Sequence, residues 1–74
     1  MFTVWIGMKG EQHEGAGWIY VFANREAALR WLEEERIGEL RRDSIDKYAP
    51  SLIKDNMFTS GCDYWKIEEQ EVIF

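Results

Sequence analysis

The pattern of apolar and polar positions predicts a first β-strand over residues 2–8. Every second side chain in this segment is large and apolar: Phe2, Val4, Ile6 and Met8. A period of two is the signature of a strand. Residues 9–17 contain three glycines and no large apolar side chain, so they are predicted to form a loop.

Residues 18–22 predict a second strand, because all five are β-branched or aromatic. Both faces of this strand are apolar: Trp18, Tyr20 and Phe22 on one, Ile19 and Val21 on the other. A strand of this kind usually lies inside a sheet or is covered on both sides. We therefore expect a hairpin with a long connection, whose second strand is central or covered.

Residues 25–36 predict the main helix. Asn24 is a suitable N-cap, Glu26 lies in the first turn where the helix dipole favours an acid, and the segment is rich in helix-forming residues. One face of this helix is apolar and is expected to pack on the sheet. It carries Ala28, Leu29 and Leu32.

Two courses are open for the chain beyond Arg36. The helix either breaks near Gly38, since a glycine inside a helix costs about 1 kcal/mol relative to alanine, or it continues and buries a second side. A second short helix is predicted at residues 44–48. Asp43 or Ser44 offers its N-cap, and Pro50 ends it.

Residues 51–63 are predicted to form a packed loop or a short helical turn. Four apolar side chains must be buried there: Leu52, Ile53, Met57 and Phe58. Residues 64–73 predict the last strand, with Trp65 and Ile67 on one face. Residues 1–74 are therefore expected to form one α+β domain: a small three-stranded antiparallel sheet in ββαβ order, one main helix and a second short helical segment. The first strand is expected to pair with the other two.

Two segments carry a resemblance at the level of pattern. VFANREAALRWL runs from a strand directly into a capped helix, and YWKIEEQEV is a final strand. Together they resemble small ββαβ domains found in bacterial and phage genomes, over most of the chain. The resemblance implies a small sheet with a helix on one face and implies no particular chemistry. Small acidic phage proteins of this size often inhibit host proteins, anti-CRISPR proteins among them.

The charge of the chain restricts its partners. Its net charge is −5 and its pI about 4.8, whereas binding to a nucleic-acid backbone requires clustered Lys and Arg. No apolar run approaches the roughly 20 residues of a membrane span. We therefore expect neither direct nucleic-acid binding nor a membrane. The start of the chain lacks a secretory signal and there is a single cysteine, so a cytoplasmic location is expected.

No set of residues in the sequence predicts catalysis, a metal site or a cofactor. A single histidine, His13, beside Glu11 and Glu14 is not a zinc pattern. Cys62 has no basic residue closer in sequence than Lys66 to activate its thiol, and we expect it to be a buried or half-buried side chain. The chain is therefore expected to have no enzymatic activity.

Aromatic residues are the feature with the clearest functional meaning. They make up 15% of the chain, and one helix can cover only one face of a sheet. The face opposite the helix is expected to carry Trp5 or Trp18 together with Trp65 and to bind another protein, because exposed apolar patches mark interfaces. The predicted interface residues are Trp5, Trp18, Tyr20, Tyr64 and Trp65. In the alternative, residues 49–62 fold over that face and hide the rings.

These patterns predict a small acidic protein-interaction domain that binds another protein chain through an aromatic sheet face, as a homodimer or with a foreign partner. The alternative is a phage-type inhibitor of a host defence protein, which presents carboxylates to the basic surface of that host protein. Clustering of six acids on one side of the molecule would favour this alternative: Glu33, Glu34, Asp63, Glu68, Glu69 and Glu71.

Overall fold

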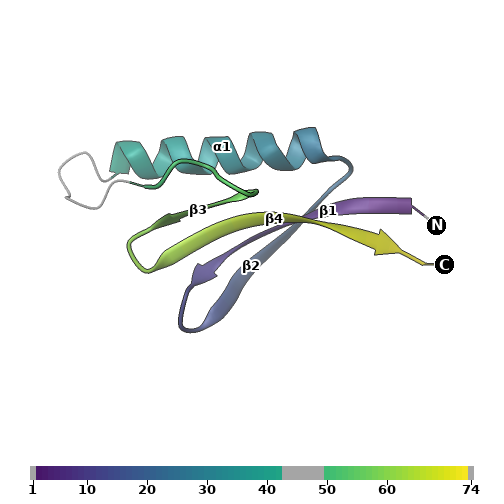
Figure 1. Ribbon diagram of the computed structural model, residues 1–74, viewed down its shortest axis with the longest axis horizontal. Coiled ribbons are helices and arrows are strands. Elements are labelled where there is room, and N and C mark those ends of the chain that lie inside the picture. Colours follow the sequence, from purple (N-terminus) through teal and green to yellow (C-terminus); the bar gives the residue numbers. More distant parts are fainter. Residues whose placement is uncertain (1, 43–49, 74) are drawn as a thin grey trace.

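The computed structural model describes residues 2–42 and 50–73 and shows one helix against one face of an antiparallel sheet (Figure 1). The elements follow one another as β1 (Phe2–Glu11), β2 (Gly15–Phe22), α1 (Arg25–Arg42), β3 (Met57–Ser60) and β4 (Asp63–Val72). The four strands lie in the order β2-β1-β4-β3. The α+β class and the pairing of β1 with two neighbours are confirmed, whereas the expected three-stranded ββαβ sheet is wrong in its strand number.

The hairpin of β1 and β2 is longer than the sequence predicted. Most of the expected loop at residues 9–17 belongs to the two strands, which leaves only residues 12–14 as a turn. The pairing contains an irregularity at which Gly17 is the extra residue, between the pairs Lys9–Trp18 and Gly10–Ala16. The glycines therefore allow close passage of two strands, and this exposed end of the hairpin needs no large apolar side chain.

The strand that was not predicted is β3. It lies in the segment that was expected to form a packed loop or a helical turn. Asp55 and Asn56 have positive φ angles of 53° and 63°, and Lys54 and Met57 on either side of them exchange two backbone hydrogen bonds. This is the geometry of a two-residue hairpin turn, which Asp and Asn tolerate better than most residues. The turn directs Phe58 into the core, where it is 1% exposed.

The helix α1 begins as the sequence predicted and continues past Gly38. The backbone N–H of Ala27 donates to Oδ1 of Asn24 at 2.9 Å, so Asn24 caps the helix. The alternative of a break near Gly38 is wrong, because α1 extends to Arg42. Ile37 and Leu40 remain exposed, so the continued helix does not bury the side that carries them. The predicted second helix at residues 44–48 lies outside the described residues.

The core lies between α1 and the half of the sheet formed by β3 and β4. Its buried members are Ala28, Leu32, Phe58, Trp65 and Ile67, and Trp5, Phe22, Leu29, Trp31 and Ile53 pack against them. The rings of Phe58 and Trp65 are stacked, with centroids 4.6 Å apart. The predicted apolar face of the helix therefore does pack on the sheet.

Replacement of Gly38 by alanine is expected to stabilise the domain. A Cβ at Gly38 would meet no atom within 4 Å, and alanine in a helix is about 1 kcal/mol more favourable than glycine. For a domain of this size the melting temperature should rise by about 4–8 °C, which thermal unfolding followed by circular dichroism measures. Gly61→Ala is the control: it is equally free of contacts, but its φ of 61° penalises alanine, so its melting temperature should fall. A fall for Gly38→Ala would contradict the prediction.

Candidate functional site

Register and packing define the two faces of the sheet. A Cβ added to Gly7 of β1 would lie 2.7 Å from the Trp31 ring of α1, and the Lys9 ammonium lies 3.3 Å from the Glu35 carboxylate of α1. Side chains alternate along a strand, so the odd-numbered residues of β1 face the helix. We call the opposite side of the sheet the open face.

Four of the five predicted interface residues lie on the helix side of the sheet: Trp5, Trp18, Tyr20 and Trp65. Tyr64 pairs with Gly10 and lies on the open face. Trp65 is 5% exposed and belongs to the core. The prediction that Trp5 or Trp18 shares the face opposite the helix with Trp65 is therefore wrong.

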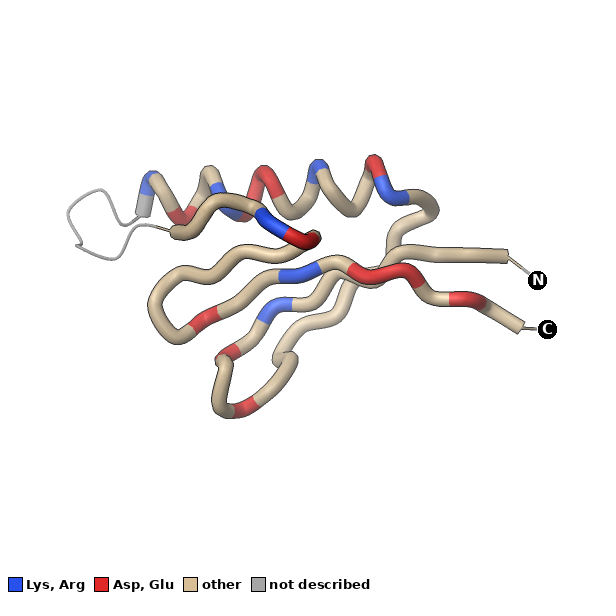
Figure 2. The backbone as a smooth tube through the Cα atoms, in the orientation of Figure 1, with Lys and Arg blue, Asp and Glu red and all other residues tan. Residues whose placement is uncertain are grey.

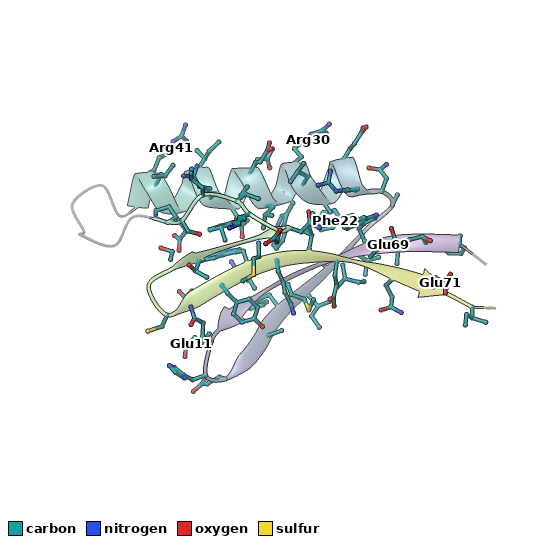
Figure 3. The ribbon with its side chains drawn as sticks, in the orientation of Figure 1. Glu11, Phe22, Arg30, Arg41, Glu69 and Glu71 are labelled. Atoms are coloured by element: carbon teal, nitrogen blue, oxygen red, sulfur yellow. The ribbon has the colours of Figure 1, made fainter. Side chains whose placement is uncertain are left out.

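The aromatic face is the covered one because its rings fill the space beneath the helix. Gly7 has no side chain, so the Trp31 ring lies directly on the sheet between two rings of β2. Its centroid is 5.3 Å from that of Tyr20 and 5.7 Å from that of Phe22. Figure 3 shows Phe22 on this side, between α1 and the sheet, whereas Arg30 and Arg41 point away from it.

The open face is aliphatic where β1 and β2 pair. The register places Ile6 of β1 beside Val21 of β2, and Met8 beside Ile19. The alternative prediction, in which residues 49–62 cover this face, does not hold for the described part of that segment. Arg36 of α1 donates to the carbonyl of Ser51 at 2.7 Å, and Ile53 packs against the core, so residues 51–53 lie on the helix side, and residues 57–60 are a strand of the sheet itself.

Strand β2 is the most exposed apolar element of the described chain. It lies at an edge of the sheet, where the sequence predicted a central or covered strand. Trp18 is 62%, Ile19 64% and Val21 65% exposed, and Tyr20, which α1 partly covers, is 41% exposed. No charged residue or proline occurs from Gly15 to Phe22. The outer edge of β2 therefore presents free backbone N–H and C=O groups without the charges that usually protect such an edge.

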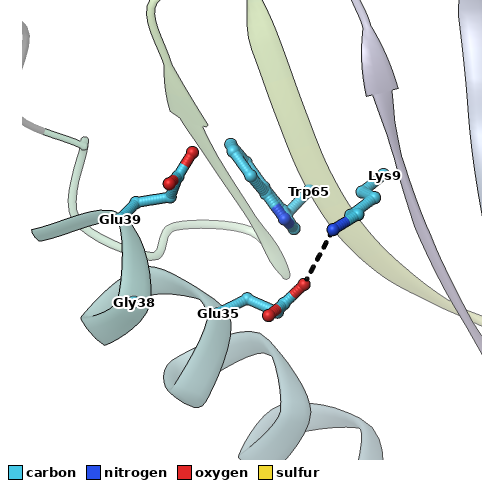
Figure 4. Close-up of a pocket in the computed structure, with 5 residues that line it drawn as sticks. All are labelled: Lys9, Glu35, Gly38, Glu39 and Trp65. Carbon is cyan, nitrogen blue, oxygen red and sulfur yellow. Dashed lines mark hydrogen bonds and ion pairs between the residues drawn. The ribbon is translucent and has the colours of Figure 1, made fainter. Parts of the chain in front are cut away.

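A small polar pocket lies between α1 and the sheet (Figure 4). It has a volume of about 190 Å³ and is lined by Lys9, Glu35, Gly38, Glu39 and Trp65. The buried indole Nε1 of Trp65 donates no hydrogen bond to any described residue. Pockets that bind small molecules usually measure about 300–1,000 Å³, so the size of this one suits a few water molecules better than a substrate.

The residues considered for catalysis or metal binding lie in exposed turns. His13 is at the tip of the β1–β2 hairpin, and Cys62 is in the turn between β3 and β4, where the expectation of a buried or half-buried thiol is wrong. The two turns are neighbours, since the N–H of Gln12 donates to the carbonyl of Cys62 at 2.9 Å. Over residues 2–42 and 50–73, no three His, Cys, Asp or Glu side chains are grouped as a metal site would require.

Acidic residues are distributed over separate parts of the surface (Figure 2). Glu33 and Glu34 lie on α1, whereas Asp63 and Glu71 lie near opposite ends of β4. Glu68 and its neighbour Glu69 point to opposite faces of the sheet, since they pair with Ile6 and Trp5. The clustering on one side that would favour an inhibitor of a basic surface is therefore not present.

Comparison with known proteins adds no functional assignment. No family model matches the chain, and no curated protein or solved structure matches it significantly. In the described part of the chain, no helix combines the length and the apolar character that crossing a membrane requires.

The predicted interface did not include Ile19 and Val21, although both are exposed in the structure. The signal was present, because residues 18–22 contain no polar or charged side chain on either face. That pattern indicates a strand that needs cover on both sides, and the described chain leaves the outer side of this strand uncovered. The strand β2 is therefore the candidate binding site.

Proposed function

We propose that this chain is a non-catalytic protein-interaction domain that binds another protein by adding a strand of that protein to the outer edge of β2. The observation that carries the proposal is the uncharged, exposed edge strand Gly15–Phe22. Strand addition is a common mode of recognition, in which backbone hydrogen bonds supply affinity and the alternating side chains supply specificity.

The side chains of β2 are suited to such binding on both faces. Trp18 and Tyr20 present rings on the helix side, and Trp and Tyr are the usual energetic anchors of interfaces. Ile19 and Val21 extend the aliphatic surface of β1 on the open face. A bound strand would thus find an aromatic surface on one side and an aliphatic surface on the other, in continuity with the sheet.

The charge of the domain favours some partners over others. A net charge of −5 repels nucleic acid and accelerates encounter with neutral or basic proteins. The binding strand itself is uncharged, so charge would govern the rate of encounter more than the stability of the complex.

A charge on β2 is expected to weaken partner binding. In Val21→Lys, an ammonium would lie in the middle of the edge that pairs, and charges at such positions prevent strand addition. Proteins captured from the source cells by the immobilised wild-type chain should be recovered about tenfold less by this variant, which corresponds to about 1.4 kcal/mol. Quantitative mass spectrometry of the captured proteins measures the ratio.

The matched control is Leu52→Lys. Leu52 is 76% exposed and precedes β3, at the other edge of the sheet, so this variant adds the same charge away from β2. It should capture as much as the wild type does. Equal capture by the wild type and Val21→Lys, with both folded by circular dichroism, would show that β2 is not the binding element.

A further inference from the structure

We infer that the strand bound by β2 is β2 of a second copy of this chain, paired antiparallel about a two-fold axis that passes between the two Tyr20 residues. This inference rests on the proposed function and names its partner. This pairing would join two four-stranded sheets into one sheet of eight strands, with both helices on the same face.

The position of the axis follows from the regular part of β2. Trp18 to Phe22 pair with β1 without interruption, whereas Gly17 is the extra residue of a bulge. A bulge bends a strand and disturbs pairing, so the regular stretch is the part that can accept a second strand. Its midpoint is Tyr20, and an antiparallel pair of identical strands places its two-fold axis at the midpoint of the paired segment.

This register matches like with like on both faces. On the helix side, Trp18 lies opposite Phe22 of the second copy, and the two Tyr20 side chains lie opposite each other. On the open face, Ile19 lies opposite Val21 of the second copy. Directly opposed aromatic pairs and β-branched pairs each stabilise antiparallel strands, so the sequence of β2 is complementary to itself.

Charge also favours a second copy on this edge. Each chain has a net charge of −5, so two copies would repel each other at most surfaces. The paired segment carries no charge, and β1 separates it from the acidic strand β4. Self-association at β2 therefore avoids opposing like charges.

The association of the wild-type chain is the first test. Pairing over a short strand buries less area than a standard interface, so we expect a dissociation constant on the order of 10–100 μM. Sedimentation equilibrium should show the mass rise from 8.8 kDa towards about twice that value between about 5 μM and about 1 mM. Val21→Lys should remain monomeric over that range and Leu52→Lys should not. A wild-type chain that stays monomeric throughout would overturn the inference.

Disulfide trapping tests the register, in a Cys62→Ser background that removes the exposed native thiol. The two residues nearest the axis face each other with Cα atoms about 4.5–5.5 Å apart, which a disulfide can bridge. Tyr20→Cys should therefore cross-link. Trp18→Cys is the control, because its two copies would lie four residues apart along the strands, about 13 Å. We expect about tenfold more cross-linked dimer for Tyr20→Cys, and equal or greater cross-linking of Trp18→Cys would overturn this register.

A second pair of variants keeps the test valid if loss of the Tyr20 ring impairs folding. Ile19→Cys and Val21→Cys lie on the open face, on the side of the sheet opposite α1. A mixture of the two should cross-link between the variants more than either does alone, since residues 19 and 21 are opposed only across the axis. Cross-linking in the mixture no greater than in the separate variants would exclude pairing about Tyr20.

The outcomes separate this inference from the proposed function. If the wild-type chain is monomeric and Val21→Lys loses the captured proteins, strand addition to β2 is retained with a foreign partner. The inference that the partner is a second copy is then overturned. A chain that neither dimerises nor captures any protein through β2 would overturn both.

Discussion

Gly10→Ala is expected to destabilise the domain by about 3 kcal/mol, the upper end of the usual effect of overpacking. A Cβ at this position would overlap the carbonyl oxygen of Gly15 and lie 2.8 Å from the backbone nitrogen of Gly17. These are backbone atoms of the neighbouring strand, so the strain cannot be relieved by a change of rotamer. The hairpin would have to separate where Gly10 pairs with Ala16.

Urea unfolding monitored by far-ultraviolet circular dichroism measures this loss. A chain of 74 residues has a stability of about 4–11 kcal/mol, so a loss of about 3 kcal/mol should lower the midpoint strongly. Gly17→Ala is the control from the same bulge: the nearest atom to its added Cβ is the carbonyl oxygen of Lys9 at 4.0 Å. Its midpoint should be close to that of the wild type. A Gly10→Ala midpoint equal to the control would mean that the two strands are not this close.

Phe58→Ala is expected to cost about 3–5 kcal/mol, which is the usual effect of removing a buried phenylalanine. Phe58 is 1% exposed and stacks on Trp65 at 4.6 Å. Loss of the Phe58 ring would leave a cavity beneath α1 and remove the ring that stacks on Trp65. Because the expected loss is a large part of the stability of a domain of this size, the variant should unfold at a much lower temperature than the wild type.

The neighbouring residue provides the control for this substitution. Met57 is on the same strand but points to the other face and is 37% exposed, so Met57→Ala should cost less than about 1 kcal/mol. Thermal unfolding and the chemical shift of the Trp65 indole proton report the two variants independently. A Phe58→Ala protein as stable as Met57→Ala would show that β3 does not carry the core contact described above.

Features that depend on neighbouring residues were predictable from the sequence. The alternation over residues 2–8 indicated β1, and the composition of residues 18–22 indicated β2. The helix start at Asn24 also followed from local chemistry, because a capping side chain bonds to an N–H only three residues away. Such signals act over one turn or one strand, and tertiary contacts seldom reverse them.

Other features were missed because a local pattern permits more than one structure. The Asp55-Asn56 pair is a signal for the turn that precedes β3. The apolar residues around this pair are equally compatible with a packed loop, which would also bury them. Glycine at position 38 permitted both a helix break and a continuous helix. The structure has the continuous helix. A glycine inside a helix is less favourable than an alanine by only about 1 kcal/mol.

The candidate site on β2 shows most clearly which features follow from the sequence and which follow from the tertiary structure. The sequence by itself determined that residues 18–22 form a strand with apolar side chains on both faces, since that depends on residue type and a period of two. Only the tertiary structure decided that this strand lies at an edge and that α1 covers the face carrying Trp5, Tyr20 and Trp65. The physical reason is that burial of a face depends on the packing of the whole sheet. Gly7 leaves room for the Trp31 ring on that face. The position of β2 at an edge depends on which strand pairs with the other side of β1, and the residues of β2 carry no information about that pairing.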